Sequence, residues 1–358
     1  MKAFAVINPI LEAIKYFYLK ANNTCIRQKI DNIIRNREVT AEQAEAIMHP
    51  AMVLERFLDE NIVMPSCAEE LFGDIPCIEG ADSLNTCIAA LLTDRALRSE
   101  IRNIDEAEQL LLSQTQAISN ITMNLTSANI HAAAEAHSYN GLLSVLEGLP
   151  LTNDSRWKIL FVLQHYEQYV RLICNSLRSA VGLIEANPQL YAYALKDFEH
   201  DYSDISDIIE VIEDENGVDT ASKDGRVYPT VIGSNSFTVH TGESDGTRTV
   251  YYVGLGVRAI GRLPLRGIEK MDYDEAFRIL ADKNRMKIMQ LLCGEQAYGL
   301  ELAEKLKLSP NTISHHMSKL QKCGLVISSF EGNRVYYRAN KAAVDEFIRM
   351  LSKKLRVK

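Results

Sequence analysis

Residues 300–340 read LELAEKLKLSPNTISHHMSKLQKCGLVISSFEGNRVYYRAN. Apolar residues at helical spacing predict a short first helix, and a tight connection follows at Leu308 and Ser309. A second helix is predicted to begin there, because Ser309 is a favourable N-cap and Pro310 is tolerated at the first helical position. Gly324 is predicted to end this helix. The stretch therefore predicts a pair of helices joined by a short turn.

The second helix is predicted to have one apolar face and one polar face. Its buried stripe is Ile313, Met317 and Leu320, spaced four and three residues apart. At about 100° per residue, the opposite face carries hydrogen-bonding side chains, none of them acidic. These are Asn311, Ser314, His315, Ser318 and Lys322, flanked by Lys319.

A β-hairpin is predicted after the second helix. Residues 325–330 and 335–338 have β-type composition, and the intervening Glu-Gly-Asn-Arg at 331–334 is typical of a hairpin turn. Two helices followed by such a hairpin predict a winged helix-turn-helix, whose second helix would enter a DNA major groove. The alternative is a protein-binding module, since small helix pairs with a hairpin also occur there.

Three runs in this part of the chain resemble the ArsR-like family of bacterial winged-helix regulators. They are LADKNRMKIMQLL at 280–292, LAEKLKLSPNTISHHMSKLQKCGLV at 302–326 and EGNRVYYRAN at 331–340. The resemblance covers roughly residues 272–352, about a quarter of the chain, with the runs in the expected order and spacing. It implies a DNA-binding transcriptional regulator, more often a repressor than an activator.

The predicted DNA contacts lie on the second helix and the hairpin. Side chains on the helix are expected to read base edges in the major groove, and lysines are expected to contact phosphates. Arg334 is expected to reach the minor groove from the hairpin tip, and Arg338 to lie near the DNA backbone. The full predicted set is Asn311, Thr312, Ser314, His315, Ser318, Lys319, Lys322, Arg334 and Arg338. His316 is expected to be a packing residue instead.

An apolar stripe on the final helix predicts a homodimer. The stripe consists of Val344, Phe347, Ile348, Leu351 and Leu355. The resemblance implies that residues 273–280 and 344–355 form a two-fold interface, and such a dimer would bind a pseudo-palindromic operator in double-stranded DNA. The alternative is that the stripe packs against the chain's own N-terminal region.

The sequence predicts no metal and no other cofactor. Metal sensors of the resembled family carry Cys-x-Cys before the recognition helix, where this chain has Ala297, Tyr298 and Gly299. The final helix also lacks His and Cys, and Cys293 and Cys323 have no ligand at a spacing typical of zinc sites. No catalytic motif is present, so an enzyme is not predicted.

Charge divides the chain into two parts. The whole chain has 358 residues and a net charge of −8, but residues 271–358 hold 16 Lys and Arg against 10 Asp and Glu. The preceding residues hold 23 against 37. A basic C-terminal module on an acidic body is what DNA binding at one end predicts. Seven scattered cysteines, and no run long enough to span a membrane, predict a cytoplasmic protein with reduced thiols.

The predicted fold class is mainly α with small β elements. Residues 1–268 are predicted to form a helical N-terminal domain with a β-rich part at 224–262, and residues 269–358 to form the winged-helix domain. The β-rich part is expected to be a small antiparallel sheet, with strands at 226–232, 237–241 and 248–253. Helices are expected at 7–21, 24–37, 40–60, 82–97, 105–121, 127–146, 155–186 and 188–213.

The N-terminal domain is expected to sense a small molecule that is not a metal, or to contact a protein partner. Aromatic residues of its helices are candidates to line a pocket, although simple core packing is the alternative. They are Trp157, Tyr166, Tyr169, Tyr191 and Tyr193. Two other functions stay open at this point: an enzyme with a fused autoregulatory DNA-binding module, and a scaffold whose winged helix binds protein.

Overall fold

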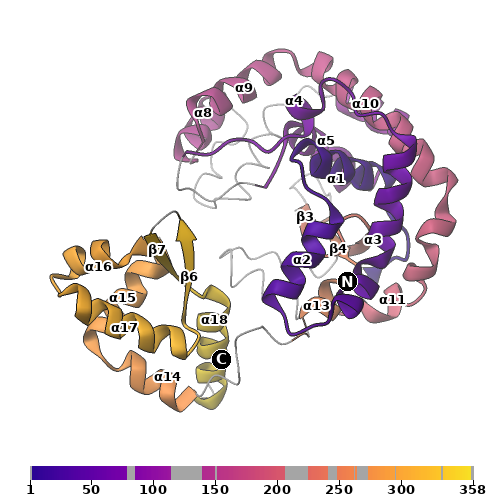
Figure 1. Ribbon diagram of the computed structural model, residues 1–358. Helices are drawn as coiled ribbons and strands as arrows, with labels where there is room; N and C mark the ends of the chain where they lie inside the picture. Colours follow the sequence, from indigo (N-terminus) through magenta and orange to yellow (C-terminus); the bar gives the residue numbers. More distant parts are fainter. Residues whose placement is uncertain are drawn as a thin grey trace. The chain divides into compact units, whose positions relative to one another are not determined.

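The computed structural model describes residues 2–78, 85–113, 139–149, 151–205, 225–240, 248–261, 263, 273–294, 296–331 and 334–355. Two compact units are present (Figure 1). The N-terminal unit comprises Met1–Arg35 and Val39–Leu263, and the C-terminal unit comprises Asn36–Glu38 and Pro264–Lys358.

The N-terminal unit is mainly helical, as the sequence predicts. Its central helix α1 packs against α4, α5 and α10 and buries Ile10, Ile14 and Phe17 in one large apolar core. The elements in chain order are β1 (Lys2–Ala3), α1 (Pro9–Ala21), α2 (Ile26–Asn36), α3 (Ala41–Asn61), α4 (Ala68–Phe72), α5 (Ile88–Arg98), α6 (Ile104–Leu112), α8 (Tyr139–Gly148), α9 (Asn153–Gln164), α10 (Tyr166–Ala186), the 3₁₀ turns η2 (Pro188–Leu190) and η3 (Ala192–Leu195), α11 (Phe198–Asp201), β2 (Arg226–Thr230), β3 (Phe237–His240), β4 (Val250–Gly254) and α13 (Val257–Gly261).

Local caps set where several of these helices begin. The Asn8 side chain accepts hydrogen bonds from the first backbone N–H groups of α1. At α3, Thr40 and Gln43 form a reciprocal capping box, a pattern typical of helix starts, where the sequence predicts a helix over 40–60. These boundaries therefore follow from short-range sequence signals.

The β-rich part forms a mixed sheet, which corrects the predicted antiparallel arrangement. Its strand order is β1-β2-β4-β3, and only the β3–β4 pair is antiparallel. Alternate residues face opposite sides: Tyr228 and Tyr252 join the main core, while Val227, Tyr251 and Val253 pack in a smaller cluster with Phe198. Both faces are covered, as is usual where strands run parallel. Residues 241–247, in the connection between β3 and β4, lie outside the described residues.

Two helix predictions are wrong in part. The helix predicted at 155–186 is two helices, α9 and α10, separated at His165. The helix predicted at 188–213 is replaced, within the described residues, by η2, η3 and the single turn α11. The helix predicted at 105–121 is described only as far as Ser113 and corresponds there to α6, and the helix predicted at 127–146 is described only from Tyr139, where α8 begins.

The C-terminal unit has the predicted winged-helix element order (Figure 1). Its core joins apolar residues from every helix, including Ile288, Leu302, Ile313 and Leu320. A three-stranded antiparallel sheet with order β5-β7-β6 completes it. The elements are α14 (Tyr273–Leu280), α15 (Lys283–Gly294), β5 (Ala297–Tyr298), α16 (Gly299–Leu306), α17 (Pro310–Lys322), β6 (Val326–Glu331), β7 (Arg334–Ala339) and α18 (Lys341–Leu355).

Candidate nucleic-acid interface

The connection between α16 and α17 fixes the direction of the second helix. Lys307 has a left-handed backbone (φ 54°) at the end of α16, and the Leu308 N–H donates to the Ala303 carbonyl at 2.9 Å. Ser309 then caps α17, because its hydroxyl accepts the backbone N–H of Thr312 at 3.1 Å. The turn and the cap together allow α17 to leave α16 at a defined angle.

Helix α17 has the two faces that its sequence predicts. Ile313, Met317 and Leu320 are buried in the core of the unit. The polar side chains on the other side of the helix are all exposed and form what we call the α17 polar face. These residues are Asn311, Ser314, His315, Ser318, Lys319 and Lys322. The face has no carboxylate, so it presents donors, neutral acceptors and positive charge to solvent.

Two other polar residues of α17, Thr312 and His316, make contacts within the C-terminal unit. Thr312 is half-buried, and its hydroxyl lies 2.8 Å from that of Ser309, so part of its hydrogen-bonding capacity is used at the cap. His316 is buried, as predicted, with Nδ1 4.0 Å from an Asp282 carboxylate oxygen. Burial lowers the pKa of His316, and Asp282 opposes that shift.

The helix that precedes the helix pair is anchored by a buried arginine that sequence reasoning did not single out. The Arg285 guanidinium donates to the carbonyls of Ile279 and Arg278, which holds α15 against the end of α14. Asp282 caps α15 by accepting the backbone N–H groups of Asn284 and Arg285, both at 3.0 Å. The backbone N–H of Arg285 is also the main reason that the pKa of Asp282 is lowered.

The hairpin places both predicted arginines on β7. Arg334 begins the strand opposite Glu331, next to the turn, and Arg338 is exposed opposite Ile327. The side chain of Arg334 lies outside the described side chains. Strand β5 pairs with β7, and Tyr298 packs edge-on against Tyr336 with ring centroids 5.8 Å apart. The hairpin is thus tied to the start of α16.

The apolar stripe of α18 is partly buried and partly exposed. Phe347 is buried and its ring lies 4.7 Å from that of Phe277 on α14, centroid to centroid. Ile348 is 53% exposed and Leu355 is 63% exposed, while Val344 and Leu351 are half-buried. Phe277 itself is 38% exposed. Helices α14 and α18 therefore present large apolar side chains to solvent.

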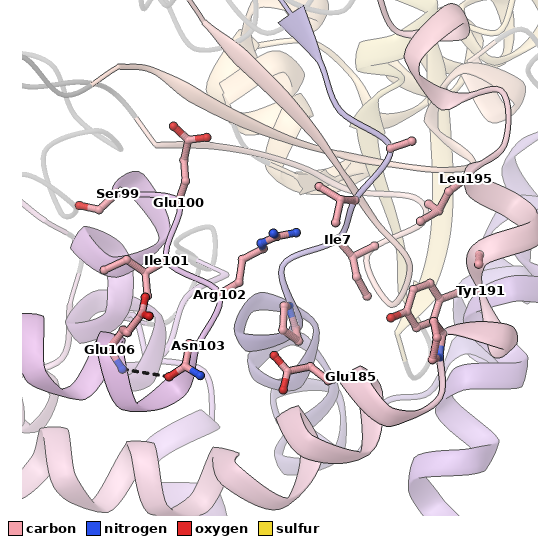
Figure 2. Close-up of a pocket in the computed structure, with 15 residues that line it drawn as sticks. Ile7, Ser99, Glu100, Ile101, Arg102, Asn103, Glu106, Glu185, Tyr191 and Leu195 are labelled. Carbon is pink, nitrogen blue, oxygen red and sulfur yellow. Dashed lines mark hydrogen bonds between the residues drawn. The ribbon is translucent and has the colours of Figure 1, made fainter.

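The N-terminal unit contains a cavity of about 850 Å³ (Figure 2). Its walls come from the β1–α1 connection, the α5–α6 connection with the start of α6, the end of α10 and the η2–η3 region. Of the aromatic residues considered from the sequence, Tyr191 lines this cavity, Tyr169 is buried in the core and Trp157 is 72% exposed. The lining mixes apolar groups with Glu100, Arg102 and other charged side chains.

Within the described part of the chain, no group of three or more His, Cys, Asp and Glu side chains is arranged to hold a metal ion. The seven cysteines are free thiols. A search of the described helices also finds none that is long and apolar enough to cross a membrane.

Comparison with known proteins places residues 282–328 in the family described as bacterial regulatory protein, arsR family. The arsenical resistance operon repressor of Staphylococcus aureus is 37% identical over 86 residues, which are 23% of this chain and 82% of that protein. The regulator CmtR of Mycobacterium tuberculosis is 40% identical over 60 residues, 17% of this chain and 51% of its own length.

Among solved structures, an ArsR-like transcriptional regulator from Rhodococcus sp. RHA1 is 32% identical, with a TM-score of 0.22. That match covers 23% of this chain and 76% of the other. The matched residues of the family model lie in the C-terminal unit, from the cap of α15 to the first residues of β6.

Proposed function

Because this chain belongs to the ArsR family of bacterial regulatory proteins, we propose that it is a sequence-specific DNA-binding transcriptional regulator, and more specifically a repressor. The observation that carries this proposal is the α17 polar face, which is exposed, free of carboxylates and held by a capped helix. A helix with these properties suits a major groove, where base edges offer donors and acceptors and the phosphates are negative.

We assign separate roles to the residues of this face. Asn311, Ser314, His315 and Ser318 read base edges. Lys319 and Lys322 contact phosphates and contribute affinity without sequence choice. The hairpin residues Arg334 and Arg338 contact the flanking minor groove and DNA backbone. Thr312 holds the start of the helix through its contact with Ser309.

The proposal is tested by binding to a DNA fragment that carries the promoter of its own gene. Affinity is expected to fall by orders of magnitude between about 50 and 200 mM salt, because phosphate contacts release counterions. The double variant Lys319→Ala/Lys322→Ala should reduce the slope of log affinity against log salt by about two, roughly one per lysine. Lys287→Ala is the matched control, because Lys287 is an exposed lysine that lies on α15 and not on α17. Retention of the promoter that does not respond to salt would refute DNA binding.

We further propose that the active form is a homodimer built through α14 and α18. The support is the exposed apolar surface of Phe277, Ile348 and Leu355, which a small module cannot cover alone. Such a dimer would bind a pseudo-palindromic operator with half-sites about one DNA turn apart.

The dimer proposal predicts that Ile348→Asp converts the chain to a monomer in light scattering after gel filtration. A carboxylate in the middle of an apolar interface would be buried without a partner, which costs several kcal/mol. Arg349→Asp is the control, since Arg349 is exposed on the other side of α18. A dimer that persists in Ile348→Asp at micromolar concentration would exclude this interface.

We also propose that the N-terminal unit senses an effector other than a metal and changes the operator affinity of the C-terminal unit. The support is that this part of the chain forms a compact unit with its own large core, and that the sequence has Ala297, Tyr298 and Gly299 where metal sensors of the family carry Cys-x-Cys. By linkage, such an effector must bind the DNA-competent and DNA-incompetent states with different affinities. Operator titration with and without a candidate ligand measures that difference, and identical affinities would reject the ligand as effector.

A further inference from the structure

Two lysine side chains of the N-terminal unit converge on the turn between β2 and β3 and on the start of β3. Lys15 Nζ donates to Ser236 Oγ at 3.1 Å and to Thr238 Oγ1 at 3.2 Å. Lys29 Nζ donates to the side-chain oxygen of the adjacent Asn235 at 3.4 Å. The partners are 206 to 223 positions apart in sequence, so only the folded chain brings them together.

Neither lysine has a counterion in the described structure. No carboxylate of the described residues lies within 4.0 Å of Lys15 or Lys29, although both side chains are partly buried. Lys20, on the same helix as Lys15, contrasts with them: its ammonium lies 2.9 Å from both Glu55 and Asp59. Moving cations out of water without pairing them with anions costs free energy, so a bound anion at this turn would be favourable.

Burial and the nearby charged groups shift the pKa of both lysines. Burial lowers the pKa of Lys15 to about 8, and Glu12, one turn earlier on α1, opposes this shift while Lys29 adds to it. Burial also lowers the pKa of Lys29, with Glu55 opposing. The pKa of the buried Glu12 is itself raised, mainly by burial. A bound anion would stabilise the charged form of both lysines and so raise the pKa of each.

The turn is held rigidly enough to serve as a binding platform. Ser236 Oγ donates to the Gly233 carbonyl at 2.9 Å, so an oxygen lone pair is left for Lys15. Gly254 approaches the turn so closely that a Cβ there would lie 2.3 Å from the carbonyl oxygens of Gly233 and Ser234. The turn also follows the carboxyl end of β2, beside that of the parallel strand β4, where ligands of parallel sheets commonly bind.

The cavity of Figure 2 shows no comparable buried charge without a partner among its described lining residues. Its Glu100 carboxylate accepts from Arg226 and Tyr228, and the Tyr191 hydroxyl donates to the Ile184 carbonyl at 3.2 Å. Its remaining charged side chains, such as Glu185, are exposed to water. Buried charge without a counterion is therefore found at the lysine pair and not at the cavity, among the described residues.

We propose that Lys15 and Lys29, together with the side chains of Asn235, Ser236 and Thr238, form a binding site for a small oxyanion, either a phosphate group or a carboxylate. Asn235 is exposed, so the site opens to solvent and could accept an anionic group carried on a larger molecule. Two ammonium groups suit a dianion, and the Thr238 hydroxyl and the Asn235 amide N–H groups can donate further hydrogen bonds to it, while Ser236 positions Lys15. Only the identification of this anion as the effector rests on the proposed function, and the existence of the site does not.

The test is isothermal titration of the full chain, without DNA, with sodium phosphate, sodium sulfate and sodium acetate. Saturable binding is expected, and Lys15→Met and Lys29→Met should each weaken it by about 10-fold or more. Arg27→Met is the matched control, because Arg27 is an exposed cation on α2 already paired with Glu45. Preference for phosphate and sulfate over acetate would identify a phosphate-type ligand, and the reverse a carboxylate.

The pH dependence separates a direct role of Lys15 from a structural one. Binding requires the ammonium form, so affinity should fall as pH rises through about 8, with proton uptake on binding near that pH. Lys15→Arg should restore binding at pH 9, since a guanidinium stays charged there. The site is overturned if none of the three anions binds saturably to the parent chain, or if Arg27→Met loses as much affinity as Lys29→Met. Failure of DNA binding would leave these results unaffected.

Discussion

Replacement of His315 with alanine is expected to lower the affinity of the chain for its operator by about 10- to 100-fold, which is roughly 1–3 kcal/mol. His315 is exposed on the α17 polar face and has no ion pair among the described residues, so truncation should not disturb the core. Its neighbour His316 is buried, which makes the two adjacent histidines a useful contrast. The operator affinity would be measured by gel retardation or fluorescence anisotropy at fixed salt.

The role of His315 is tested by comparing the loss of affinity for operator DNA with the loss of affinity for random DNA. His315→Ala should weaken binding to the operator much more than binding to random DNA, since a base contact contributes to specificity and a phosphate contact does not. Lys319→Ala should weaken both to a similar degree. Gln290→Ala, an exposed substitution on α15, should change neither. An equal loss on operator and random DNA for His315→Ala would remove this residue from the base-reading set.

The winged-helix part of the fold could be predicted from sequence because its signals are short-range. Ser309 and Pro310 mark the start of α17, and the spacing of Ile313, Met317 and Leu320 gives its buried face. The outward direction of the polar residues then follows from helical geometry. The same reasoning placed the start of α3 through its capping box.

The break between α9 and α10 could not be predicted in the same way. Neither Gly nor Pro occurs at Gln164, His165 or Tyr166, and the apolar spacing continues across the junction. After α10, Tyr191, Leu195 and Phe198 are buried at a spacing of four and three, which is also the spacing of a continuous helix. Separate short turns can therefore produce the pattern of one helix.

The mixed sheet and the lysine pair were missed because they depend on contacts between distant parts of the chain. Strand β1 has two residues, too few for a periodic signal, and its partner β2 begins at Arg226. Lys15 and Lys29 read as ordinary helix-surface lysines in the sequence. Only their common approach to the turn at Asn235 and Ser236 distinguishes them from solvated side chains.

The largest expected effect on stability is that of Glu12→Ala. Glu12 is fully buried, and its carboxylate accepts the backbone N–H groups of Val231 at 2.9 Å and Ile232 at 2.7 Å. It thereby joins α1 to the turn that carries the proposed oxyanion site. Alanine would leave both donors buried without an acceptor, at about 1–3 kcal/mol each, so we expect a total loss of roughly 2–5 kcal/mol. For a unit of this size, that loss corresponds to a fall in Tm of about 5–15 °C.

The dependence on pH tests the cause of this loss. Burial raises the pKa of Glu12 in the folded chain. The contribution of Glu12 to stability is therefore fully present below the pKa that it has in the unfolded chain, and it diminishes as pH rises through the pKa that it has in the folded chain. The cost of Glu12→Gln, measured by urea unfolding, should therefore be larger at pH 5 than at pH 8. Glu42→Ala serves as the control, because Glu42 is exposed and should change the stability by less than about 0.5 kcal/mol. A Tm for Glu12→Ala within 2 °C of the parent chain would show that the turn finds other acceptors, which would also weaken the case for a rigid platform beneath Lys15 and Lys29.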